Sequence, residues 1–164
     1  MIILAHSCTG KTKLAQRHQD ILDHDDLNAV KRWGAKIDDL WDTLSFGKSG
    51  LMLPVLAGWH GCTAQKIQEM EQHSCHDILL CYPTTSCMNE YMERLLDRNF
   101  GDLVHKFSNK NIANDEMMQL MRNSFKSGFK EFDNAKFERV KRIRLRPGQF
   151  LEQALLENGV QLGD

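Results

Sequence analysis

A turn-rich segment close to the N-terminus carries the residue types best suited to chemistry. It reads Ala5-His6-Ser7-Cys8-Thr9-Gly10-Lys11-Thr12 and matches the phosphate-binding pattern Gly-x-x-x-x-Gly-Lys-Ser/Thr, except that Ala5 replaces the first glycine. Gly10 lets backbone N–H groups approach phosphate oxygens closely. Lys11 adds a full positive charge, and the Thr12 hydroxyl suits Mg²⁺. We therefore expect a site for ATP with Mg²⁺ whose phosphate-contacting residues are His6, Ser7, Cys8, Thr9, Gly10, Lys11 and Thr12.

The flanking residues place this segment between a strand and a helix. The apolar run Ile2 to Ala5 is typical of a short buried strand, and residues Lys11 to His18 predict a helix with Leu14 and Ala15 facing inward. The positive end of that helix points at the same anion. The alternative is an ordinary strand–turn–helix without a ligand, because a Gly-Lys-Thr tripeptide often arises by chance.

An acidic cluster, Asp23-His24-Asp25-Asp26, follows a second short strand expected over Asp20 to Asp23. In phosphoryl transfer, one carboxylate orients the accepting hydroxyl as a base while metal and cations spread the charge. On this interpretation Asp23 assists Thr12 at Mg²⁺. The alternative is a solvated turn in which Asp26 caps the next helix, since acid-rich turns are common.

Strand, loop, helix, strand and then Asp23-His24-Asp25-Asp26-Leu27-Asn28 resemble the start of the polynucleotide kinase-type and small phage-type P-loop kinases. Their second strand ends in a pattern like Asn-Arg-Asp-Asp-x-Arg, and the first Asp of the adjacent pair is the base. The resemblance implies that Asp25 has this role. Asn28 stands where the family has Arg, and Asp23 stands where it commonly has Asn.

A second segment continues the resemblance. Residues Asp77 to Pro83, followed by Glu90-Tyr91-x-x-Arg94-x-x-x-Arg98, resemble the third strand and arginine-bearing helix of phage nucleotide and hydroxymethyluracil-DNA kinases. This implies that Arg94 and Arg98, which share one helix face, form a lid or substrate clamp. The alternative is a pair of surface arginines bonded to Glu90, Glu93 or Asp97.

The remaining pattern alternates strands with helices, which predicts an α/β fold with a mainly parallel sheet of about four or five strands between two helical layers. Further strands are expected at Ile78 to Tyr82, stopped by Pro83, at Val140 to Leu145, and within Leu51 to Ala57. Further helices are expected over Thr63 to His73, over Ser86 to Asn99, from Asn114 or Asp115 through Phe129, and from Pro147 to Gly159 with Phe150 on its apolar face. We interpret residues 1–164 as one P-loop kinase-like domain with a helical substrate or lid region around 86–132.

Ligands of such sheets bind beyond the carboxyl ends of the strands. The first three strands end in His6 to Thr12, Asp23 to Asp26 and Tyr82 to Thr85, so these segments form the candidate site. The basic segment Arg139 to Arg146 alternates with apolar residues, which fits either contact with a nucleic acid or ATP or, more commonly, a charged edge strand.

The composition indicates where the protein acts and which general partners it lacks. The net charge of −1 gives no general attraction to nucleic acid or membrane. No apolar run approaches the about 18 residues that span a bilayer, and the opening residues lack a basic signal-peptide region. The odd number of cysteines, five, without a Cys-x-x-Cys pair, favours free thiols. These features predict a cytoplasmic protein.

The leading hypothesis is an ATP-dependent phosphotransferase that acts on a hydroxyl or phosphate of a nucleoside, nucleotide or nucleic-acid end. The alternative is a nucleotide-binding regulatory or interaction protein with the same fold and little catalysis, which the departures at Ala5 and Asn28 favour.

Overall fold

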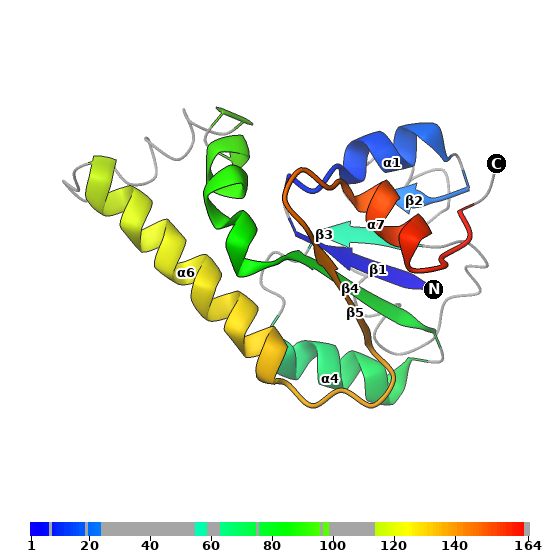
Figure 1. The fold of residues 1–164 in the computed structure, drawn as a ribbon. Coiled ribbons are helices and arrows are strands. Elements are labelled where there is room, and N and C mark those ends of the chain that lie inside the picture. The colour runs from blue at the N-terminus through cyan, green and yellow to red at the C-terminus, as the bar shows by residue number, and fades with distance from the viewer. Residues whose placement is uncertain are drawn as a thin grey trace.

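Five parallel strands form the centre of the molecule (Figure 1). The computed structural model describes residues 1–6, 8–18, 20–23, 55–58, 63–74, 76–95, 97–98 and 114–162. The strands are β1 (Ile2–Ala5), β2 (Leu22–Asp23), β3 (Val55–Gly58), β4 (Ile78–Pro83) and β5 (Lys141–Leu145). Their spatial order is β2-β3-β1-β4-β5, and each neighbouring pair is parallel. The strand expected within Leu51 to Ala57 is therefore present as β3, between β2 and β1.

Helices cover both faces of the sheet (Figure 1). They are α1 (Lys11–Arg17), α4 (Ala64–His73), α6 (Asn114–Asn134) and α7 (Leu151–Glu157), together with a helix over residues 88–95 that follows the 3₁₀ turn Thr85–Cys87. Helices α1 and α7 pack on one face, and α4 and α6 on the other. No helix in the described segments is both long and apolar enough to cross a membrane.

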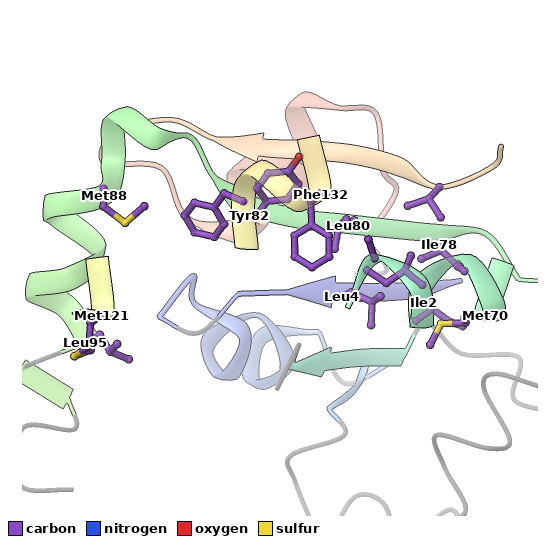
Figure 2. Packing of buried hydrophobic residues seen from close by; sticks show 14 of the residues in the cluster. Ile2, Leu4, Met70, Ile78, Leu80, Tyr82, Met88, Leu95, Met121 and Phe132 are labelled. Carbon is purple, nitrogen blue, oxygen red and sulfur yellow. The ribbon is translucent and has the colours of Figure 1, made fainter. Parts of the chain in front are cut away.

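The alternating side chains of β1 connect the two halves of the core. Ile2 and Leu4 face α4 and α6, whereas Ile3 and Ala5 face α1 and α7. All four side chains are fully buried, as expected for a central parallel strand covered on both faces. Figure 2 shows the first half, where Leu4 and Leu80 of the sheet lie near Phe132 of α6 and Met70 of α4.

Most predicted elements are confirmed, but several boundaries differ. The second strand is only Leu22–Asp23, because the Ile21 N–H donates to the His18 carbonyl and keeps the preceding residues in a turn. Pro83 does not stop β4; it pairs with Leu145, and the next N–H, that of Thr84, donates to the Leu145 carbonyl. The last strand begins after Val140, whose N–H donates to Glu71 instead.

The closing helix begins later than predicted. Pro147 belongs to a turn, since Gly148 has φ 75°, a left-handed conformation that interrupts a helix. Helix α7 therefore begins at Leu151, with Phe150 as its N-cap. The prediction that Phe150 packs on the apolar face was wrong, because 44% of this residue is exposed.

Strand β5 is an edge of the sheet, and its arginines and the following Arg146 bond to the chain itself. Arg142 donates to backbone carbonyls at the end of α6 and beyond it, Arg144 pairs with Asp133, and Arg146 pairs with Glu157. Of the two interpretations of the basic segment, these contacts match a charged, protected edge strand.

The connections reverse direction between β1 and β4. The chain leaves β1 towards β2 through α1 on one face. It leaves β4 in the opposite direction towards β5, through the 88–95 helix and α6, and α6 lies on the other face. In parallel sheets, ligands bind beyond the carboxyl ends of two neighbouring strands whose connections run in opposite directions. In this chain those strands are β1 and β4.

Candidate functional site: a phosphate-binding loop at the carboxyl end of β1

The loop after β1 has the backbone geometry of an anion receptor. Cys8 has φ 61° and Gly10 has φ 100°, so two residues separated by Thr9 adopt left-handed conformations. Such conformations turn successive N–H groups towards one side, forming a concavity that favours anions. Helix α1 begins at the next residue, Lys11, and the N–H groups of its first turn have no acceptor within the helix. The backbone N–H groups of the loop and those of the first turn of α1 are therefore available as donors at the same place.

Buried hydrogen bonds hold the loop against the sheet. The Thr9 side chain is fully buried, and its hydroxyl donates to the His6 carbonyl at 2.8 Å. The His6 N–H donates to the Cys81 carbonyl of β4 at 3.1 Å, and the Leu151 N–H of α7 donates to the Thr9 carbonyl at 2.9 Å. The loop is therefore fixed from two elements distant in sequence, which reduces the ordering needed when a ligand binds.

His6 has a packing role at this edge. Its side chain is buried and packs in T-shaped geometry against Phe125 and Phe129 of α6, with ring centroids 5.0 and 5.3 Å away, and against Tyr91 at 6.3 Å. Its side chain therefore joins the loop to α6 and the 88–95 helix.

Lys11 and Thr12 occupy the first turn of α1. The Lys11 side chain is largely buried, and its Nζ donates to the Ala5 carbonyl over a long 3.4 Å. The ammonium thus lies at the start of the loop, on the side of β1. Thr12 is exposed, so its hydroxyl is accessible to a ligand. These positions agree with the predicted phosphate and Mg²⁺ roles without testing them.

Gly10 has both a conformational and a steric reason to be glycine. A side chain is strained at φ 100°. A Cβ there would also lie 3.2 Å from Cδ1 of Phe150. The aromatic ring that precedes α7 therefore packs directly on the loop backbone.

Arg94 reaches this ring from the 88–95 helix. Its guanidinium carbon lies 4.4 Å from the centroid of Phe150 and 5.0 Å from that of Tyr91, and it is bonded to Glu90. Arg94 thus forms the i,i+4 ion pair of the second interpretation and also lies beside the loop. Its role as a lid or substrate clamp stays a prediction. Arg98 is helical and exposed.

Tyr91, whose ring Arg94 covers, is buried. Burial raises the pKa of Tyr91 to about 12, and the positive charge of Arg94 opposes this rise. The Tyr91 hydroxyl stays protonated at neutral pH and donates to the Gln149 carbonyl at 3.3 Å. Tyr91 is therefore a support for the turn before α7.

Asp23 ends β2 and is buried, and it pairs in register with Leu56 of β3. Because β3 lies between β2 and β1, Asp23 lies two strands away from β1, about 10 Å at ordinary strand spacing. Ser7, His24, Asp25, Asp26 and Asn28 lie outside the described residues. The base role of Asp25 stays a prediction.

Two features of this site are not evident from the motif. Phe150 was expected in a helix core, and Glu90 only as an ion-pair partner. A glycine-containing turn just before Phe150, Pro147-Gly148, was the available signal that the ring precedes the helix. Its contact with Gly10 joins residues 140 positions apart by number and has no local signature.

No group of three or more His, Cys, Asp or Glu side chains within the described ranges is arranged to hold a metal ion. Cys8, Cys81 and Cys87 are free thiols, and burial raises the pKa of Cys81 to about 12.

The likeness of this chain to known proteins is structural. No protein-family model matches the chain, and no curated protein matches it. Among solved structures, a gluconokinase from Sinorhizobium meliloti 1021 aligns with a TM-score of 0.45 and 14% identity, covering 94% of this chain and 89% of that one.

Proposed function

We propose that the chain is an ATP-dependent phosphotransferase of the P-loop kinase type. The observation that carries the proposal is the pair of left-handed residues, Cys8 and Gly10, immediately before a helix that opens with Lys11. It lies at the carboxyl end of the central strand β1, beside the point where the connections diverge. An anion with several oxygens suits this set of donors.

Each of these residues has a proposed role in phosphoryl transfer. The loop N–H groups and Lys11 hold the triphosphate, and Arg94 neutralises charge on the transferred group. Thr12 and Asp23 supply hard oxygen donors, which fit Mg²⁺; the ion, when bound, offsets negative charge on the phosphates. We assign Asp25 as the base. It accepts the proton of the acceptor hydroxyl as that oxygen bonds to the γ-phosphorus, the bond from the γ-phosphorus to the bridging oxygen breaks, and ADP leaves.

The acceptor class rests on the resemblance of residues 23–28 and 77–98 to kinases that act on nucleotides and nucleic-acid ends. We accordingly propose a nucleoside, nucleotide or nucleic-acid hydroxyl or phosphate as acceptor. A screen with ATP labelled in the γ-phosphate, against sugars as well as these acceptors, identifies it. Transfer to sugars alone would contradict the acceptor class but not the kinase assignment.

Nucleotide binding is tested by titration calorimetry with ATP and Mg²⁺. We expect Lys11→Ala to weaken binding at least about tenfold, or 1.4 kcal/mol, because it removes the charge beside the loop. Lys66→Ala is the matched control, since Lys66 is exposed on α4, and it should leave the affinity unchanged. Wild-type protein that binds no nucleotide would overturn the proposal.

The base assignment has its own test. Asp25→Asn should reduce transfer by about 10²-fold or more while ATP affinity stays near that of wild type, because the general base acts only in the chemical step. Asp26→Asn, the adjacent carboxylate, is the comparison. Full turnover in the Asp25 variant would remove it as the base.

The second candidate is a nucleotide-binding regulatory protein with little catalysis. Ala5 in place of glycine and Asn28 in place of arginine favour it, since both depart from the kinase pattern. ATP binding without transfer to any acceptor in the screen would select this alternative.

A further inference from the structure

The turn between β5 and α7 is bound to the phosphate loop and to the 88–95 helix at once. On the loop side, the Leu151 N–H donates to the Thr9 carbonyl, and Phe150 packs against Gly10. On the helix side, the Gly148 N–H lies 2.9 and 3.1 Å from the two carboxylate oxygens of Glu90. The carboxylate of Glu90 is thus part of the framework around the loop.

The same carboxylate also holds Arg94. One of its oxygens accepts from Arg94 Nη2, and the guanidinium then lies over both the Phe150 and Tyr91 rings. Both partners of this ion pair are partly buried, so solvent screens the pair less than it would screen a surface pair. Two aromatic faces and one carboxylate therefore set the orientation of the guanidinium.

Arg94 retains an unused donor. Its Nη1 is buried and has no hydrogen-bond partner within the part of the chain that the structure describes. Buried donors in folded proteins are nearly always paired, so an acceptor that enters beside Arg94 would satisfy this N–H group. A phosphate oxygen is a suitable acceptor, because a guanidinium stays charged and binds such oxygens with a planar fork.

We propose that Glu90 is a positioning residue for nucleotide binding: it orients Arg94 over Phe150, beside the phosphate loop, so that the guanidinium is set for a phosphate oxygen before ligand arrives. The proposal rests on the proposed function, because it requires a nucleotide in the loop. Glu90 touches no ligand itself. Its effect on the nucleotide passes entirely through Arg94.

A double-mutant cycle tests this route. We expect Glu90→Gln to raise the Kd for Mg-ATP about three- to tenfold and Arg94→Met about tenfold, with the double variant no weaker than Arg94→Met alone. Glu93→Gln, an exposed carboxylate on the same helix, makes the same charge change and should leave Kd unchanged. A Glu90→Gln effect that persists undiminished in the Arg94→Met protein, or no effect at all, would overturn the proposal.

A second measurement needs no ligand. The side-chain N–H resonance of Arg94, identified by its loss in Arg94→Met, should carry a ring-current shift in wild type and move towards that of an exposed arginine in Glu90→Gln. Phe150→Leu, which leaves Glu90 intact, should also move it and raise the Kd for Mg-ATP. An unshifted resonance in wild type, or one that both variants leave in place, contradicts the positioning role even if Glu90→Gln folds poorly.

The outcomes separate the two proposals. Wild-type protein without any affinity for Mg-ATP removes the proposed function and with it the ligand role of Glu90. Wild-type binding combined with an independent Glu90→Gln effect removes only the positioning role.

Discussion

The backbone conformation of the loop after β1 depends on two positive φ angles, those of Cys8 and Gly10. The left-handed conformation of Gly10 costs glycine little, and the one at Cys8 is uncommon for a residue with a side chain. A strained residue of this kind persists only where its surroundings determine it. Here Thr9, between the two, is buried and bonded on both sides, through its hydroxyl and its carbonyl. The geometry of the loop is thus built into the folded protein.

Gly10→Ala tests that geometry. We expect a loss of about 1–3 kcal/mol in the free energy of unfolding, because the substitution places a Cβ at φ 100° and 3.2 Å from Phe150. Mg-ATP binding should weaken as well. Urea unfolding and calorimetry measure the two effects.

Gly128→Ala is the control for this change. Gly128 lies inside α6, and nothing lies within 4 Å of an added Cβ. We expect it to stabilise the protein by about 0.5–1 kcal/mol, since alanine favours helix over glycine. Equal effects at the two positions would show that the loop conformation is unimportant.

Between elements, the contact around Glu71 joins α4 to the segment before β5. The buried carboxylate accepts from the N–H groups of Glu138, Arg139 and Val140, and the Arg139 side chain donates to the Glu71 and Ser74 carbonyls. Burial alone raises the pKa of Glu71, but these N–H groups and the Arg139 charge outweigh it, so its pKa lies below 4.5. The charged form is therefore the one that stabilises the fold.

A pH dependence of stability follows. Because the pKa of Glu71 is lower in the folded state, its contribution is fully present above pH 4.5 and is lost as the pH falls through the folded-state value. Glu71→Gln should cost about 1–3 kcal/mol of unfolding free energy at pH 7. The difference from wild type should shrink below pH 4.5. Urea unfolding over this pH range measures it.

Glu69→Gln provides the comparison, since Glu69 is exposed on the same helix. It should alter stability by less than about 0.5 kcal/mol at every pH. A Glu71→Gln deficit that does not change with pH would contradict the role of the carboxylate charge.

For the molecule as a whole, β1 connects the site to both halves of the core. Ile3 and Leu4 are neighbours in sequence but face opposite helical layers, and each is fully buried. The phosphate loop begins where this strand ends. Its position thus depends on packing on both sides of the sheet.

Truncation at either position should destabilise the whole protein. We expect Ile3→Ala and Leu4→Ala each to cost about 2–5 kcal/mol, through lost burial and the cavity left behind. Unfolding should remain a single transition by far-UV circular dichroism and tryptophan fluorescence. Leu120→Ala, at a half-exposed position on α6, should cost much less. Two separate transitions would show that the layers unfold independently.

The local pattern was sufficient to predict most elements and the loop. Ile2 to Ala5 and Ile78 to Tyr82 are apolar runs with a strand's length, and Gly10-Lys11 marks a helix start after a strand, so each signal lies in adjacent residues. The boundaries that differed were decided by distant partners. The N–H of Val140 donates to Glu71, so Val140 is not part of β5. Pro83 remains part of β4 because it pairs with Leu145 of β5.

The sequence by itself determined which chemical groups the loop carries and at what spacing, and this is the basis on which phosphate binding is proposed. Only the tertiary structure decided which residues surround it. The contact of Phe150 with Gly10, and the bond from Glu90 to Gly148, join segments that meet only when β1, β4 and β5 lie side by side. Such contacts depend on strand order, and strand order is a property of the whole sheet that no local spacing encodes.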